Sequence, residues 1–221
     1  RAWKQERYGQ DWRVGDTINA SIGQGYVLTS PLHLAVMTAR IATGKAVVPR
    51  LVRSVDGIEV AIPEAPDLDL QPGFLDLVRR GMSAVVNSRR GTANGSRIVA
   101  AEWTMAGKTG TSQVRNITAA ERARGVISND QLPWNRRDHG LFVGYAPYDN
   151  PRYAISLVVE HGGGGASAAA PVARDIRLFA LHGGVPPLAA YPESQRGRIK
   201  TLQDSLKLID PDTLSGGRSR A

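Results

Sequence analysis

The stretch Gly107-Lys108-Thr109-Gly110-Thr111-Ser112 decides how the rest of this sequence is interpreted. It lies within residues 103–114, which have the composition of a β-strand broken by glycines. Two more strands are predicted at residues 139–146 and 153–160, where apolar, β-branched residues are flanked by turn residues. A long polar segment, residues 115–138, separates the first two strands, and segments of that length are usually functional or disordered.

Helices are predicted before and after these strands. The first begins at Pro31, after the cap candidates Thr29 and Ser30, and ends before Gly44. Because it is apolar on nearly every side, we expect it to be buried. A second helix begins at Phe74 and shows the clearest helical periodicity in the chain. Its apolar face consists of Phe74, Leu77, Val78, Gly81, Met82 and Val85.

The outer face of the second helix carries Asp76 and Arg80, which are expected to pair across one turn. A last helix begins near Pro171 and ends before Gly183. The residues expected on its buried face are Val172, Ile176, Phe179 and Ala180. Helices first, then neighbouring strands, then a closing helix indicate an α+β fold with an antiparallel sheet flanked by helices.

The domain organisation is predicted to be simple. Residues 46–60 look extended, with a turn at Asp56-Gly57. We assign residues 1–183 to one folded domain. Residues 184–221 are rich in Pro, Arg and Ser and are expected to form a flexible tail.

Composition narrows the classes of function. The chain has 221 residues, 42% of them hydrophobic, which suffices for one domain with a core. The net charge of +8 would suit a polyanion, but the basic residues are scattered, so nucleic-acid binding ranks last. The absence of cysteine excludes thiolate catalysis and Cys-rich zinc sites. The four histidines lack the H-E-x-x-H spacing, so no metal site is predicted.

The Lys-Thr-Gly stretch contains residue types suited to holding an extended peptide. An edge strand offers backbone groups to such a peptide, and Gly110 permits close approach. The hydroxyls of Thr109 and Thr111 can donate to a terminal carboxylate, while Lys108 supplies positive charge. A backbone N–H after the glycine can serve as half an oxyanion hole. Taken alone, the stretch fits equally well a solvated lysine on a strand with a glycine bulge.

Several segments, read in order, resemble the class B penicillin-binding proteins, especially their elongation-specific members. The segments that carry the resemblance are Gly15-Asp16-Thr17, Ile22-Gly23-Gln24-Gly25-Tyr26, Ser30-Pro31-Leu32-His33-Leu34-Ala35, Gly91-Thr92-Ala93, Ala106 through Val114, Arg137-Asp138-His139, Phe142 through Pro147, and Glu160-His161-Gly162-Gly163. The resemblance extends over roughly residues 12–181.

The resemblance implies a partial β-lactamase/transpeptidase-like fold. It also implies the activity of a serine D,D-transpeptidase, which cross-links peptidoglycan stem peptides through an acyl-enzyme. By this resemblance Lys108 and Thr109 help bind the substrate carboxylate, and the backbone of Thr111 contributes to the oxyanion hole. The expected catalytic residues are therefore Lys108 and Thr111. The expected substrate-binding residues are Thr109, Gly110, Ser112 and Gln113.

The partners implied by the resemblance are a stem peptide ending in D-Ala-D-Ala, β-lactam antibiotics, and proteins of the elongation machinery. No cofactor, metal or nucleic acid is implied. The implied location is the periplasmic face of the bacterial inner membrane. Because no stretch here approaches the roughly 18 apolar residues of a membrane span, we expect the anchor upstream of Arg1.

The sequence departs from the family in one serious respect. No serine is followed three residues later by a lysine, so the Ser-x-x-Lys nucleophile motif is missing. Ser128-Asn129-Asp130 has the spelling of the second family motif, but it follows Lys108 instead of preceding it, and we interpret it as coincidence. The chain is therefore expected to be the C-terminal half of a transpeptidase domain, inactive alone.

Other interpretations remain open. The chain would fit a non-catalytic binding or scaffold module of the same fold, or a relative that acts as a β-lactamase or D,D-carboxypeptidase. His139 and His161 lie at predicted strand ends, where a histidine is a candidate general base. Packing at the strand edge is the favoured interpretation for both, because the resembled family uses lysine for that role.

Overall fold

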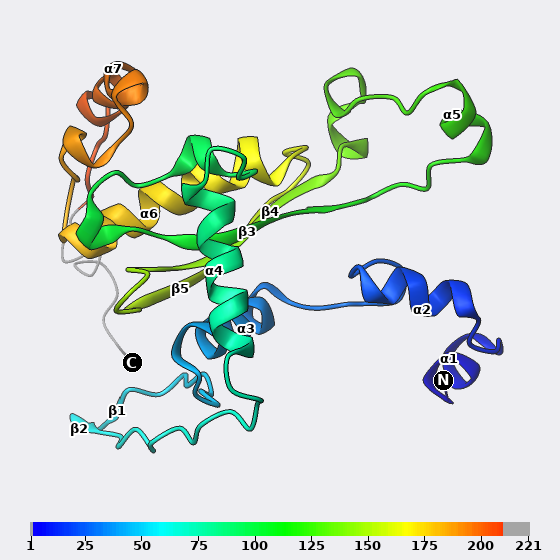
Figure 1. Cartoon of the computed structure of the whole chain (residues 1–221), viewed down its shortest axis with the longest axis horizontal. Coiled ribbons are helices and arrows are strands. Elements are labelled where there is room, and N and C mark those ends of the chain that lie inside the picture. The colour runs from blue at the N-terminus through cyan, green and yellow to red at the C-terminus, as the bar shows by residue number, and fades with distance from the viewer. Residues whose placement is uncertain (1, 210–221) are drawn as a thin grey trace.

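A three-stranded antiparallel sheet is the centre of the computed structural model, which describes residues 2–209. Its strands are β3 (Ala106–Ser112), β4 (His139–Ala146) and β5 (Tyr153–Val159), in the order β3-β4-β5 (Figure 1). The three predicted strands are confirmed, although β3 is shorter than expected. Within residues 2–209, β4 alone pairs with β3, so β3 is an edge strand.

Helices cover both faces of this sheet. On one face, α4 (Phe74–Asn87) contacts β3, and α3 (Pro31–Thr43) contacts β4 and β5. Side chains of successive strand residues point to opposite faces. Val143 accordingly lies beside α3 and α4, whereas its neighbour Gly144 lies beside α6 (Ala170–His182). The α+β architecture with flanking helices is therefore confirmed as three layers.

Local signals correctly located the ends of α3. The Ser30 hydroxyl accepts a hydrogen bond from the His33 N–H at 3.3 Å, and Pro31 occupies the first helical position. The helix ends at Gly44, whose φ of 74° is left-handed and favours glycine. These signals depend on a few neighbouring residues, which explains why they could be read from the sequence.

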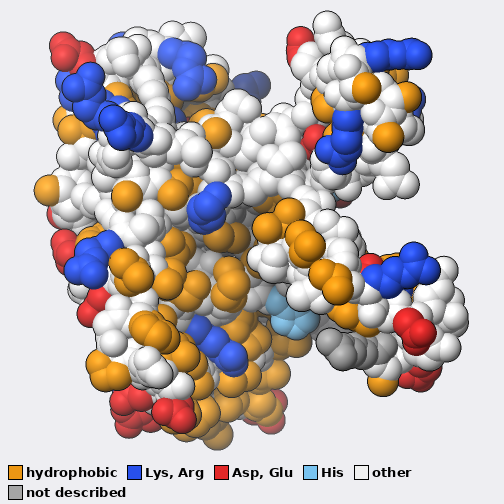
Figure 2. All heavy atoms as spheres, turned by 45° about the vertical axis from the view of Figure 1, so that its right-hand side comes forward, with side chains coloured by type: hydrophobic (Ala, Val, Ile, Leu, Met, Phe, Trp, Pro, Cys, Tyr) orange, Lys and Arg blue, Asp and Glu red, His pale blue; other side chains and the backbone are white. Residues whose placement is uncertain are grey.

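The predicted burial of α3 is wrong. Leu32 is 55% exposed and Met37 is 42% exposed, and the buried residues of the helix are Thr38 and Ala42. The apolar face of α4 is similarly open at its N-terminal end, where Leu77 is 65% exposed. Three strands are too few to cover both helices. Figure 2 shows the resulting hydrophobic area in the lower part of the molecule.

The pairing predicted within α4 is corrected by one residue. Asp76 pairs with Arg79, at 3.2 Å, rather than with Arg80. Arg79 turns toward α3, because its Nε donates to the carbonyl of Ile41 at 2.7 Å. This hydrogen bond satisfies a carbonyl at the C-terminal end of α3 and joins the two helices.

The segment predicted as a flexible tail begins with ordered structure. Helix α7 (Glu193–Asp204) follows a short turn, and Tyr191 and Ile199 are buried in the main core. The carbonyl of Ala190 also accepts a hydrogen bond from the Val99 N–H at 2.8 Å. The expectation of a tail is therefore wrong for residues 188–204. Residues 210–221 lie outside the described residues, and the boundary at residue 183 stays a prediction.

The buried face of α6 differs from the one predicted. Val172, Ile176 and Phe179 are more than 40% exposed. The residues that face the protein interior are Ala170, Ala173, Arg174, Arg177 and Leu178. A π-helical turn (Gly165–Ala169) leads into α6, and Ala168 in this turn lies close to Gly140 of β4, while Arg177 of α6 lies close to Gly144. The periodic pattern could not reveal which of two partly apolar faces meets the sheet.

Arg177 is the least expected residue in this interior. It is 1% exposed, and its guanidinium lies 5.4 Å from the Phe142 ring centre and 3.0 Å from the Met105 sulfur. Among the described residues, no acceptor contacts its Nε or Nη2. Burial lowers the pKa of Arg177 to about 9, so the group is charged at neutral pH and its burial is costly.

We expect Arg177→Met to raise the free energy of unfolding at pH 7 by about 1–2 kcal/mol, because a hydrophobic side chain of similar length removes this cost. Arg177→Ala should instead lower it, because the truncation leaves a cavity. Urea unfolding followed by circular dichroism measures both variants. A loss of stability in the methionine variant would contradict the expectation.

The remaining elements lie around this centre. Helices α1 (Ala2–Tyr8) and α2 (Val14–Ser21) are joined by the Lys4–Asp16 ion pair, at 2.6 Å. Strands β1 (Ser54–Val55) and β2 (Ile58–Glu59) form a short hairpin within the segment predicted to be extended, and its turn is the predicted one at Asp56-Gly57. Helix α5 (Ala119–Arg124) lies in the long β3–β4 segment, which projects from the sheet in Figure 1. None of the helices within residues 2–209 is long and apolar enough to span a bilayer.

Candidate functional site

Lys108 lies where the edge strand meets the apolar face of α4. It borders an open hollow of about 440 Å³ whose other lining is apolar, from α3, α4 and β4. The residues that line this hollow are Met37, Val78, Gly81, Met82, Val85, Lys108 and Val143. The Lys108 ammonium donates to the carbonyl of Thr109 at 2.8 Å. The lysine therefore lies at the rim of this hollow, on the face of the sheet that α3 and α4 cover.

The C-terminal part of the predicted strand site lines a second hollow, of about 560 Å³. Four of the predicted residues contribute to it: Gly110, Thr111, Ser112 and Gln113. Opposite them lie residues 22–25 and the first turn of α3, including Leu34. The position of residues 22–25 was not predicted, because their contact with β3 joins segments far apart in the chain.

The backbone of Gly110 is in close contact with a second glycine, Gly165. A Cβ atom built on Gly165 would overlap the carbonyl of Leu141 and would lie 2.5 Å from the Gly110 oxygen and 2.9 Å from its nitrogen. Gly165 therefore lets the turn before α6 approach the backbone of β3 closely. This contact fixes the backbone position of the strand at the residue that was predicted to admit a peptide.

Thr109 lies apart from the other predicted residues. It lines neither hollow, and its hydroxyl lies 3.0 Å from that of Thr92. The sequence pointed to Thr92 only as part of a resemblance, and its contact with Thr109 was not foreseen. Thr109 and Thr92 together place two hydroxyl groups at the strand edge.

The long β3–β4 segment is ordered by an ion pair. Arg115 donates to both carboxylate oxygens of Glu121, at 2.7 and 2.6 Å. The Ile127 N–H donates to the same carboxylate at 3.3 Å. Hydrogen bonds from Arg115 lower the pKa of Glu121, and the bond from Ile127 acts in the same direction.

This carboxylate predicts a pH dependence for the projecting segment. A carboxyl group with a lowered pKa stabilises the folded form above its ordinary pKa, and this stabilisation is lost as pH falls through the lower value. We expect residues 115–127 to become mobile below about pH 4, and Glu121→Gln to make them mobile at pH 7. Amide relaxation measured by NMR across this range tests both, with the exposed Glu102→Gln as control. A segment that stays rigid in the glutamine variant would contradict the expectation.

The two histidines support the loop rather than forming an exposed base. The His161 N–H donates to Nδ1 of His139 at 2.9 Å, and Nδ1 of His161 lies 2.9 Å from the carbonyl of Arg137. The His161 ring also packs edge-on against Trp134. This agrees with the interpretation of strand-edge packing. Within the described residues, no group of three or more His, Cys, Asp or Glu side chains is placed to hold a metal ion.

The Ser-Asn-Asp sequence in the same segment also has a structural role. Asn129 accepts a hydrogen bond from the Asp138 N–H at 2.8 Å and donates to the Asp138 carboxylate at 3.2 Å. These bonds close the base of the segment beside the start of β4. They agree with the interpretation that its similarity to the second family motif is coincidence.

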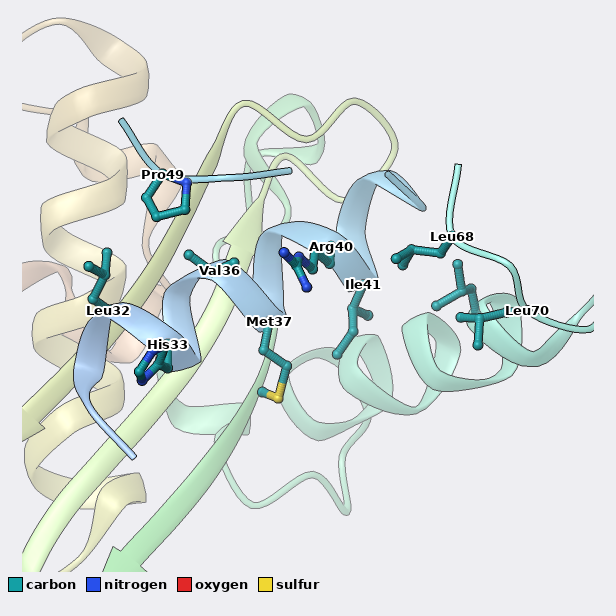
Figure 3. A pocket seen from close by; sticks show the side chains of 10 residues that line it. Leu32, His33, Val36, Met37, Arg40, Ile41, Pro49, Leu68 and Leu70 are labelled. Carbon is teal, nitrogen blue, oxygen red and sulfur yellow. The ribbon is translucent and has the colours of Figure 1, made fainter. Parts of the chain in front are cut away.

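A further hollow, of about 500 Å³, lies along α3 (Figure 3). Its lining is mostly apolar, with side chains such as Leu32, Ile41 and Leu70. Its two polar side chains form hydrogen bonds within the fold: the His33 ring bonds to the Ser30 hydroxyl, and Arg40 donates to the carbonyl of Val47. This hollow offers packing surface rather than a chemical site.

The fold and the strand site define a class of protein. Residues 3–177 match the family described as the penicillin-binding protein transpeptidase domain, so the chain belongs to that family. The peptidoglycan D,D-transpeptidase MrdA of Haemophilus influenzae is 36% identical over 197 residues, which are 86% of this chain and 30% of the relative. The MrdA of Acinetobacter baumannii is 39% identical over 180 residues, covering 77% of this chain and 25% of the relative.

The particular protein that the chain resembles is penicillin-binding protein 2. The structure of this protein from Pseudomonas aeruginosa in complex with WCK 5153 has a TM-score of 0.64 at 36% identity, covering 87% of this chain and 39% of that one. The Helicobacter pylori protein, in complex with MreC, has a TM-score of 0.63 at 33% identity, covering 81% and 30%. The chain thus spans well under half the length of the relatives it matches.

Proposed function

We propose that this chain is the C-terminal part of a peptidoglycan D,D-transpeptidase domain and supplies its substrate-binding strand. The observation that carries the proposal is the edge position of β3, with Lys108 at the rim of one hollow and Gly110 through Gln113 lining the next. An extended peptide can add to such an edge as a further strand.

Each residue of the strand has a role in this proposal. Lys108 provides positive charge beside the terminal carboxylate of a D-Ala-D-Ala peptide, and Thr109 donates a hydrogen bond to it. The backbone N–H of Thr111 stabilises the oxyanion that forms when a serine attacks the peptide carbonyl. Gly110 keeps the strand accessible, and Ser112 and Gln113 extend the contact. β-Lactams, which carry a comparable carboxylate, bind at the same place.

The nucleophile comes from a part of the domain outside this chain. The exposed apolar faces of α3 and α4 support this, because surfaces as open as Leu32 and Leu77 are normally covered. The relatives are also about three times longer than the region matched. The remaining part of the domain packs on these faces and brings a Ser-x-x-Lys serine beside Lys108. The chain alone is inactive in this proposal.

The proposal extends to location and partners. The whole protein is anchored in the bacterial inner membrane and acts on its periplasmic face. It works with proteins of the elongation machinery, for which the MreC complex of the Helicobacter pylori relative gives a precedent. No cofactor is needed, because the chemistry is acyl transfer through a serine.

Acylation by a labelled penicillin tests the proposal. The test compares this chain with the translation product that extends it upstream, here called the complete polypeptide. We expect the complete polypeptide to contain a Ser-x-x-Lys motif and to form a covalent adduct, and this chain alone to form none. A complete polypeptide that folds without being acylated would favour the non-catalytic scaffold instead.

A further inference from the structure

The contact between Thr92 and Thr109 joins two segments that are 17 residues apart. Their hydroxyl oxygens are separated by 3.0 Å, and either oxygen is able to donate the hydrogen. Thr92 is exposed and Thr109 is partly exposed, so both groups are reachable from the edge of β3. Thr92 is not among the residues given a role in the proposed function, although its hydroxyl lies within hydrogen-bond distance of the Thr109 hydroxyl.

The turn that carries Thr92 is fixed on both sides. The Gly91 N–H donates to the carbonyl of Ser88 at 2.9 Å, and the Ala93 N–H donates to the carbonyl of Val85 at 3.0 Å. A Cβ atom at residue 91 would overlap the carbonyl oxygens of Ala84 and Val85, so the turn requires glycine there. The C-terminal end of α4 thus positions the Thr92 hydroxyl without help from a ligand.

The number of hydrogens on the two hydroxyls determines the direction of their hydrogen bonds. Each hydroxyl has one hydrogen to donate and two lone pairs to accept with. When Thr92 donates to Thr109, the hydrogen of Thr109 is free to bond to an anion at the strand edge. Such a chain of hydrogen bonds is cooperative, because each bond polarises the next. A ligand carboxylate, which only accepts, favours this direction.

We propose that Thr92 is a positioning residue that directs the Thr109 hydroxyl toward the terminal carboxylate of the substrate. This inference rests on the proposed function, because it assumes that Thr109 contacts that carboxylate. It adds a carboxylate-recognition role for the turn after α4, which lies outside β3.

The test measures how the complete polypeptide discriminates a carboxylate from a neutral group. The ligands are a penicillin and its methyl ester, which lacks the charge, and the measurement is the ratio of their second-order acylation constants. We expect Thr92→Val to lower this ratio by about fivefold to tenfold, the effect of losing one hydrogen bond between neutral groups. Thr92→Ser should restore the ratio, and Thr201→Val, on the exposed side of α7, should leave it unchanged.

A double variant tests whether Thr92 changes the acylation ratio through Thr109. If Thr92 acts through Thr109, Thr92→Val has no further effect on the ratio once Thr109→Val is present. Equal slowing of the penicillin and the ester by Thr92→Val would show a purely structural turn and overturn the inference. So would an undiminished effect in the double variant. Failure of the complete polypeptide to be acylated at all would instead overturn the proposed function, and the inference with it.

Discussion

Gly165→Ala is expected to lower the free energy of unfolding by about 2–4 kcal/mol, one of the two largest effects predicted for this chain. The added methyl group would meet the carbonyl of Leu141 and the backbone of Gly110, which are main-chain atoms. Side chains can rotate away from an inserted group, but the backbone of two paired strands cannot do so without breaking the sheet.

The matched control for this variant is Gly197→Ala in α7. A Cβ atom at residue 197 meets nothing within 4 Å, so alanine there should stabilise the helix by about 0.5–1 kcal/mol. Urea unfolding of both variants gives the comparison. If the Gly165 variant unfolds at the same urea concentration as the wild type, the close contact between the turn and β3 does not exist.

Lys108→Met is expected to reduce the acylation rate of the complete polypeptide by about 100-fold. Methionine keeps the length of the side chain and loses its charge, so the loss reports on the ammonium group. The effect is large because the rest of the domain would cover the hollow beside Lys108, and charge interactions strengthen when water is excluded.

A second lysine provides the comparison for this variant. Lys200 on α7 pairs with Asp204 at 2.8 Å on the protein surface, and Lys200→Met should change the rate less than twofold. Stopped-flow or quenched-flow kinetics with a labelled penicillin measures both. If the two methionine variants react at the same rate, Lys108 has no part in binding the carboxylate.

The accuracy of the sequence predictions depended on how local each signal was. The start of α3 at Pro31 and its end at Gly44 were predicted correctly, because capping needs only adjacent residues. Strand β4 was predicted to the residue, since its ends are set by Asp138 and the turn at Pro147. The strand that carries Lys108 was likewise found from its own residues.

The predictions that failed concern which faces of the helices and strands pack against each other. The burial of Met37 was predicted wrongly because the apolar composition of a helix does not show whether another element covers it. The buried face of α6 carries Arg177, which lies close to Gly144 of β4, and this contact joins distant segments. The contact of Thr92 with Thr109 and the position of residues 22–25 beside Gly110 also depend on tertiary packing. No periodicity in the sequence encodes these contacts.

The order of the sheet has one further consequence. Strand β5, like β3, has a strand on one side only within the described residues, so its outer row of amide and carbonyl groups is open. Such a border is a template on which another chain can add, and it would drive concentrated solutions of the isolated chain toward fibrous assembly. A strand that paired with this outer row would remove the template and so act against such assembly.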